Sequence, residues 1–109
     1  NAGFQIIECM DRGAIGAMPG CSMYDIYLKI YNAYVRGDRA EAIRIHNALL
    51  PMLNHIRQNV EQIISFEKRI LKLRGIIKSD YCRNPSYNTD KYFDKLFDDL
   101  YSDLKEYFD

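Results

Sequence analysis

The sequence has little of several features that would point to a particular class of protein. Its 15 Lys and Arg residues balance 15 Asp and Glu residues, so the zero net charge gives no argument for a nucleic-acid or membrane partner. No apolar run approaches the length that spans a bilayer, and we expect no signal peptide. Three scattered cysteines are too few for a disulfide framework, which favours a reducing, cytoplasmic compartment.

A complete catalytic or metal-binding constellation is also missing from the sequence. His46 and His55 have no Cys, Asp or Glu at metal-ligand spacing, and His46 is interpreted as a hydrogen-bonded core residue. The carboxylates after residue 88 lack the glycine of a calcium loop. Cys21 has no base in its sequence context and is interpreted as structural. We therefore predict no metal and no cofactor.

What the sequence does contain is helical periodicity and one short apolar run. Gly13–Ala17 is the candidate strand, and the turn signal Pro19-Gly20 follows it. Asn1 is predicted to cap a short helix that ends near Arg12, although Phe4–Ile7 also fits a strand. Because a lone strand cannot satisfy its own backbone hydrogen bonds, we expect the chain to be the end of something larger.

Four further helices are predicted from residue 22 onwards, each with apolar residues at helical spacing. Gly37 ends the first, and a capping box from Asp38 to Glu41 begins the second, in which Pro51 predicts a kink. Gly75 closes the third. The first carries an apolar stripe that favours a core or helix–helix interface, formed by Tyr24, Tyr27, Leu28, Tyr31, Tyr34 and Val35.

The sharpest helical pattern belongs to residues 88–109, which are acidic and aromatic. They carry 3 Lys and Arg against 7 Asp and Glu, whereas residues 1–87 carry 12 against 8. The basic run in residues 68–83 is interpreted as a solvated helix face or as a partner for this tail. The apolar face of the tail is expected to pack on preceding helices or on a neighbouring subunit; it comprises Phe93, Leu96, Phe97, Leu100, Tyr101, Leu104 and Phe108.

The order of several short motifs resembles the dihydrodipicolinate synthase and N-acetylneuraminate lyase family over residues 1–86. Gly13–Ala17, Gly37-Asp38 and Ala42 are similar to that family's eighth strand, the joint after its eighth helix and the helix that follows. Three later pieces are similar to its proline-kinked helix, its lysine-containing helix and its terminal Arg-x-Pro, namely Leu50-Pro51, Lys68–Gly75 and Tyr81–Pro85.

The resemblance implies a (β/α)₈ barrel with extra C-terminal helices, of which this chain would hold only the C-terminal portion. The fold class expected for the chain itself is mostly α, with about five helices and one strand. Enzymes of the family form a Schiff base between a barrel lysine and pyruvate or another 2-oxo acid, as aldolases or dehydratases. That lysine would lie in a missing N-terminal barrel portion, because Lys68 and Lys72 are not its counterparts. The chain alone should be inactive, and a homo-oligomer is implied, a tetramer in the family.

The resemblance also assigns parts of this chain to a site, although it places no catalytic residue here. Ile15, Gly16 and Ala17 would bind substrate at the carboxyl end of the eighth strand, the face on which barrel active sites lie. Ala17 stands where sialic-acid-type lyases have a serine, which argues against a sialic acid substrate. The regions implied are the last helix–strand–helix of the barrel in 1–37, a helical appendage in 38–87 and an acidic aromatic helix in 88–109.

A second hypothesis from a different class is a non-enzymatic helical interaction or oligomerisation module. In that case the tyrosine stripe and the aromatic tail would bind a partner. The two hypotheses differ in what precedes Asn1, because a lyase needs most of a barrel of about 250 residues upstream.

Overall fold

The computed structural model describes residues 3–109, and its regular elements are all helical. The α-helices are α1 (Ile6–Asp11), α2 (Tyr24–Val35), α3 (Arg39–Ile56), α4 (Val60–Leu73) and α5 (Lys91–Leu104), and short 3₁₀ helices span Cys21–Met23 and Lys105–Tyr107. The predicted fold class, mostly α with about five helices, is confirmed for this part of the chain. The cap expected at Asn1 lies outside the described residues.

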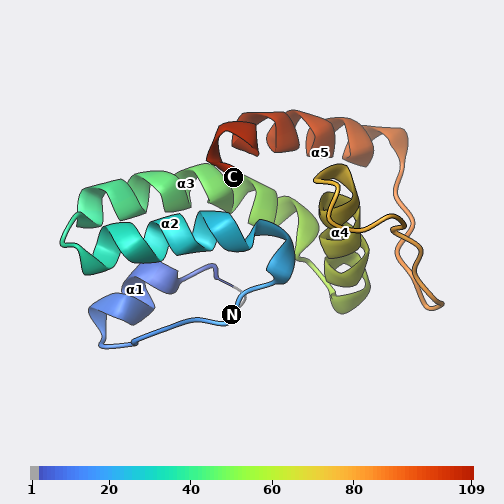
Figure 1. Cartoon of the computed structure of the whole chain (residues 1–109). Helices are drawn as coiled ribbons and strands as arrows, with labels where there is room; N and C mark the ends of the chain where they lie inside the picture. Colours follow the sequence, from blue (N-terminus) through green and yellow to red (C-terminus); the bar gives the residue numbers. More distant parts are fainter. Residues whose placement is uncertain (1–2) are drawn as a thin grey trace.

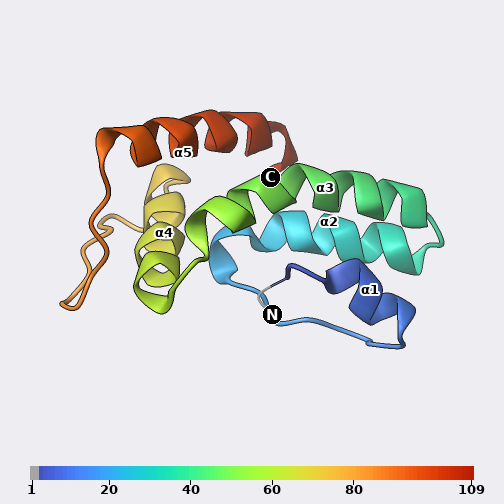
Figure 2. The ribbon, with the colours of Figure 1, turned by 180° about the vertical axis from the view of Figure 1, so that it is seen from behind.

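The helices are arranged around a central antiparallel pair formed by α2 and α3 (Figure 1). α1 lies against this pair on one side, together with the extended chain that links it to α2 (Figure 1). α4 crosses the end of the pair, and α5 returns along α3 on the side away from α1, as the view from behind also shows (Figure 2). The start of α2 therefore lies near α4, and its end lies near α1.

Asp or Asn side chains cap three of the helices in the way the sequence predicts for α3. The Asp38 carboxylate accepts a hydrogen bond from the Glu41 backbone N–H at 3.1 Å, which confirms the start of α3. Asn59 and Asp90 accept equivalent bonds at the starts of α4 and α5. α3 continues through Pro51, so this proline is not the end of the helix.

The core lies where α2, α3, α4 and α5 meet. Phe66 of α4 and Phe97 of α5 are fully buried, with ring centroids 5.0 Å apart. Phe93 packs on Phe66 at 5.3 Å and stacks on His55 at 3.8 Å. The predicted packing of the tail on preceding helices therefore takes place through its aromatic face.

Two expectations need correction. Residues 14–20 are extended, but over residues 3–109 no strand forms, because no second strand lies beside them to share backbone hydrogen bonds. The α2 stripe belongs to the core only in part: Tyr27 is buried and Tyr31 and Tyr34 pack against the core, whereas Tyr24, Leu28 and Val35 are exposed. The buried face is instead formed by Met23, Ile26, Tyr27, Ile30 and Ala33.

Candidate substrate-binding segment

The three residues predicted to bind substrate, Ile15, Gly16 and Ala17, lie in an extended segment that runs from Ala14 to Gly20. One end is held by the Ala14 N–H, which donates to the Cys9 carbonyl at 3.0 Å. The Tyr31 hydroxyl donates to the Ile15 carbonyl at 3.2 Å and so ties the segment to α2. The side chains of Ile15 and Met18 are 90% and 99% exposed, although both are apolar. The segment thus presents an apolar edge that nothing in residues 3–109 covers.

Two of the three predicted site residues share a hollow between this segment and α2. Its volume is ≈ 230 Å³, and it is lined by Ile6, Gly16, Ala17, Pro19, Tyr24, Tyr27, Leu28 and Tyr31. Ile15 is not among the lining residues, so its side chain does not join the other two. The part of the α2 stripe that the core leaves uncovered faces this segment, which explains why α2 has two apolar faces.

A buried ion pair supports the end of the segment, and sequence reasoning did not find it. The Arg57 Nη2 lies 2.5 Å from the Glu67 Oε1, with the two side chains only 2% and 13% exposed. The other Glu67 oxygen accepts the backbone N–H of Ser22 at 2.8 Å. A Cβ at Gly20 would overlap the Glu67 carboxylate, so the glycine permits this close approach. Burial raises the pKa of the neighbouring Tyr27 to about 12.

A second polar cluster joins α1 to the central helix pair. The Asp11 carboxylate accepts from Arg39 Nη2 at 2.6 Å, from Arg39 Nε at 3.1 Å and from the Tyr34 hydroxyl at 2.7 Å. The Arg39 hydrogen bonds, followed by that from Tyr34, lower the pKa of Asp11 to about 2. The same contact raises the pKa of Tyr34.

This cluster predicts a pH dependence for the docking of α1. Because the Asp11 pKa falls from 3.8 unfolded to about 2 folded, its contribution to stability is present above pH 3.8 and lost as pH falls to 2. The difference in unfolding free energy between wild type and Asp11→Asn should therefore shrink over that window. Urea titrations at successive pH values would measure it. Arg39→Gln should flatten the same dependence, and a difference that grows with acid would contradict the assignment.

Two of the side chains that the sequence analysis weighed for other chemistry, His46 and Arg69, have partners in the structure, whereas Cys21 is exposed. His46 Nε2 donates to the Gly3 carbonyl at 2.9 Å, which confirms a hydrogen-bonded core histidine. Arg69 of the basic run pairs with Asp94 of the tail at 2.8 Å. Among residues 3–109, no group of three His, Cys, Asp or Glu side chains is placed to hold a metal ion. Within the same range, no helix is long and apolar enough to cross a membrane.

The described elements follow one another as a short helix, an extended segment, a second helix against that segment and three further α-helices. The chain is similar to a solved structure, the dihydrodipicolinate synthase from Rhodopseudomonas palustris, with a TM-score of 0.86 and 29% sequence identity. The match covers 94% of this chain and 34% of that one. The resemblance predicted from the sequence, to the C-terminal portion of such an enzyme, is thereby confirmed.

The comparison also defines how much of the matched protein this chain spans, which is about a third. No family model and no curated protein matches the sequence.

Proposed function

We propose that this chain is the C-terminal portion of a lyase that forms a Schiff base with pyruvate or another 2-oxo acid. The observation that carries the proposal is the structural match to a dihydrodipicolinate synthase, which covers 94% of this chain. The extended segment 14–20 agrees with it, because neighbouring barrel strands would pair with its backbone, and the packed layers on the two faces of a barrel sheet would cover exposed side chains such as those of Ile15 and Met18. The three unpaired cysteines fit a cytoplasmic enzyme.

The residues of this chain would shape one edge of the active site and supply no reacting group. Ile15, Gly16 and Ala17 would border the 2-oxo acid at the carboxyl end of the eighth strand, with Ile15 acting through its backbone. The Schiff-base lysine would come from the preceding barrel portion, where the imine acts as an electron sink for making or breaking the adjacent bond. Residues 1–37 would complete the barrel, 38–87 form the appendage and 88–109 the final helix of a homo-oligomeric enzyme.

The chain by itself is expected to form no adduct with pyruvate. Two of its lysines, Lys68 and Lys72, lie on the surface of α4: Lys72 Nζ pairs with Asp80 at 3.5 Å, and Lys68 Nζ donates to the Tyr81 carbonyl at 3.1 Å. A nucleophilic lysine needs a desolvated site, and neither position provides one. Mass spectrometry after pyruvate and borohydride treatment should show the unmodified chain. A stoichiometric adduct that disappears in Lys68→Arg or Lys72→Arg would contradict this prediction.

The alternative, a non-enzymatic interaction module, is favoured by a single observation. Tyr24, Leu28 and Val35 leave an exposed apolar face on α2, beside the exposed Ile15 and Met18. In the lyase this face is covered by the protein's own barrel, whereas in the module it binds a separate partner. The size of the native protein separates the two, because only the lyase needs a preceding barrel.

A further inference from the structure

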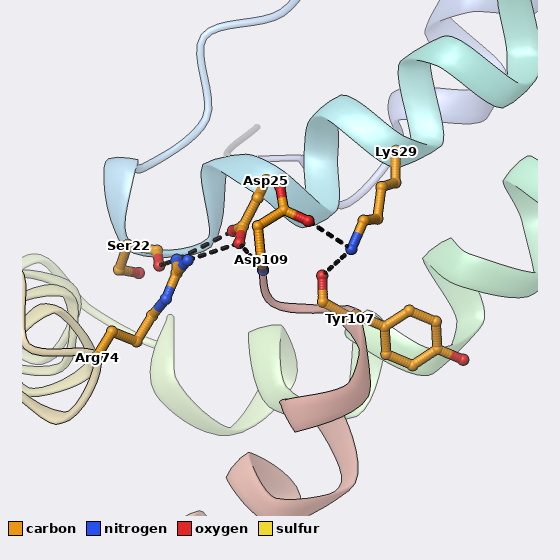
Figure 3. Close-up of polar contacts among 6 residues, drawn as sticks. All are labelled: Ser22, Asp25, Lys29, Arg74, Tyr107 and Asp109. Atoms are coloured by element: carbon orange, nitrogen blue, oxygen red, sulfur yellow. Dashed lines mark hydrogen bonds and ion pairs between the residues drawn. The ribbon is translucent and has the colours of Figure 1, made fainter.

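The loop that follows the candidate segment is held at a single residue by two side chains, Glu67 of α4 and Arg74, which directly follows α4. Ser22 is fully buried, and its N–H donates to Glu67 Oε2 at 2.8 Å. Its carbonyl accepts from Arg74 Nη1 at 2.6 Å, as Figure 3 shows. Both backbone groups of Ser22 are therefore bound to charged side chains, which make stronger hydrogen bonds than neutral ones.

Arg74 is itself fixed by a second buried ion pair. It donates to Asp25 from Nη1 at 3.0 Å and from Nη2 at 2.5 Å, and the two side chains are 14% and 7% exposed. Asp25 belongs to the first turn of α2, just after the loop. The bidentate geometry fixes the guanidinium plane, so the hydrogen bond to Ser22 depends on the position of Asp25.

Residues 107–109 complete this arrangement from the far end of the sequence. The Asp109 N–H donates to Asp25 Oδ2 at 2.8 Å, and the Arg74 guanidinium lies over the Phe108 ring, 4.3 Å from its centroid. Lys29 donates to the Tyr107 carbonyl at 2.6 Å and pairs with the Asp109 carboxylate at 3.0 Å (Figure 3). Residues 107–109 thus cover the Arg74–Asp25 pair and give Asp25 an additional hydrogen-bond donor.

We propose that residues 107–109 act as a strap that positions the loop at Gly20–Ser22, with Arg74 as the positioning residue that connects the two. Docking of the strap excludes water from the Arg74–Asp25 pair and so strengthens the hold on the Ser22 carbonyl. Release of the strap exposes the Arg74–Asp25 pair to water, and the pair then holds the loop as weakly as a surface ion pair would. The effect of the strap on substrate binding rests on the proposed function, because the loop that it positions follows the segment expected to border the 2-oxo acid.

Amide hydrogen exchange tests the strap directly. Removing residues 107–109 should weaken the charge-assisted hydrogen bond from Arg74 to the Ser22 carbonyl. The loop then opens more often, so the Ser22 N–H, which is bound to Glu67, should exchange roughly tenfold faster. Lys29→Met, which frees the strap without touching Arg74 or Ser22, should act in the same direction. Asp109→Asn keeps the backbone bond to Asp25 and should change the rate by less than about twofold. Lys95→Gln removes an exposed ion pair within α5 and should leave Ser22 unchanged.

Other outcomes would overturn the strap. If the exchange rate of the Ser22 amide stays the same after truncation, residues 107–109 do not position the loop. A uniform rise that includes the amides in the middle of α3 shows that the tail contributes only global stability. In the intact enzyme that the proposed function requires, the truncation should raise KM for pyruvate several-fold and leave kcat within about twofold. If no Schiff base forms there while Ser22 exchange responds as expected, the proposed function fails and the strap stands.

Discussion

Phe97→Ala should lower the free energy of unfolding by about 3–5 kcal/mol, because it empties a fully enclosed site between α3, α4 and α5. Phe97 is 0% exposed and contacts Phe66, and Tyr101 is stacked on it with ring centroids 6.0 Å apart. The truncation removes the aromatic contacts that hold α5 to the rest of the chain. Urea unfolding would measure the loss, and limited proteolysis after Pro85 would show whether α5 is released.

Two matched variants separate apolar packing from charge in this interface. Leu96 is the preceding residue and is 47% exposed, so Leu96→Ala should cost far less than Phe97→Ala. Asp98→Asn should scarcely change stability, since exposed charges contribute between about 0 and 1 kcal/mol. The Arg69–Asp94 pair is partly exposed and should add a similarly small amount. Proteolysis that responded to salt and to Asp98→Asn, but not to Phe97→Ala, would show that charge dominates.

Glu67→Leu should be comparably damaging, with an expected loss of about 3–5 kcal/mol. The substitution leaves the Arg57 guanidinium without its counter-charge while its side chain remains 2% exposed. It also removes the acceptor of the Ser22 N–H, a bond that holds the loop after the candidate segment. Urea unfolding would measure the loss, and Ser22 exchange would show its local part.

The matching double variant separates the two contributions. Arg57→Met together with Glu67→Leu should recover at least half of the loss, because replacing both members of a buried pair removes the uncompensated charge. The remainder reflects the Ser22 N–H left without its acceptor. A double variant as unstable as the sum of the two single variants would show that Arg57 and Glu67 do not act as a pair.

Local sequence signals predicted the helical elements well because their causes are local. The Asp38 capping bond to Glu41, for example, depends only on residues within one turn. The aromatic face of residues 88–109 also predicted the packing of α5, since a helix with so many apolar residues on one side must bury them. The resemblance was found in the same way, from the order and spacing of short motifs.

The strand and the buried polar contacts could not be predicted from local signals. Gly13–Ala17 has the composition of a strand, but a strand needs a partner, and none lies beside it within residues 3–109. The stripe on α2 is covered by the core only in part, because helical period shows that a face is apolar and not what covers it. The pairs of Arg57 with Glu67 and Arg74 with Asp25 join different elements, and no spacing rule connects them.

The surroundings of the candidate segment could be predicted only in part for a similar reason. Gly16 and Ala17 do share a hollow with α2, but the Tyr31 hydrogen bond to the Ile15 carbonyl has no signal in the sequence. The loop after them is fixed by α4 and by residues 107–109, which lie far along the chain. Such support is visible only once tertiary structure brings the three segments together.

Borohydride trapping of the native protein that carries this sequence tests the central claim most directly. The protein would be isolated through its C-terminal segment, treated with pyruvate and borohydride, and analysed by intact-mass and peptide mass spectrometry. We expect a protein long enough for a complete barrel, with one reduced pyruvate per chain on a lysine that precedes Asn1. A native protein no larger than these 109 residues, or a complete barrel that traps no pyruvate, would contradict the proposed function.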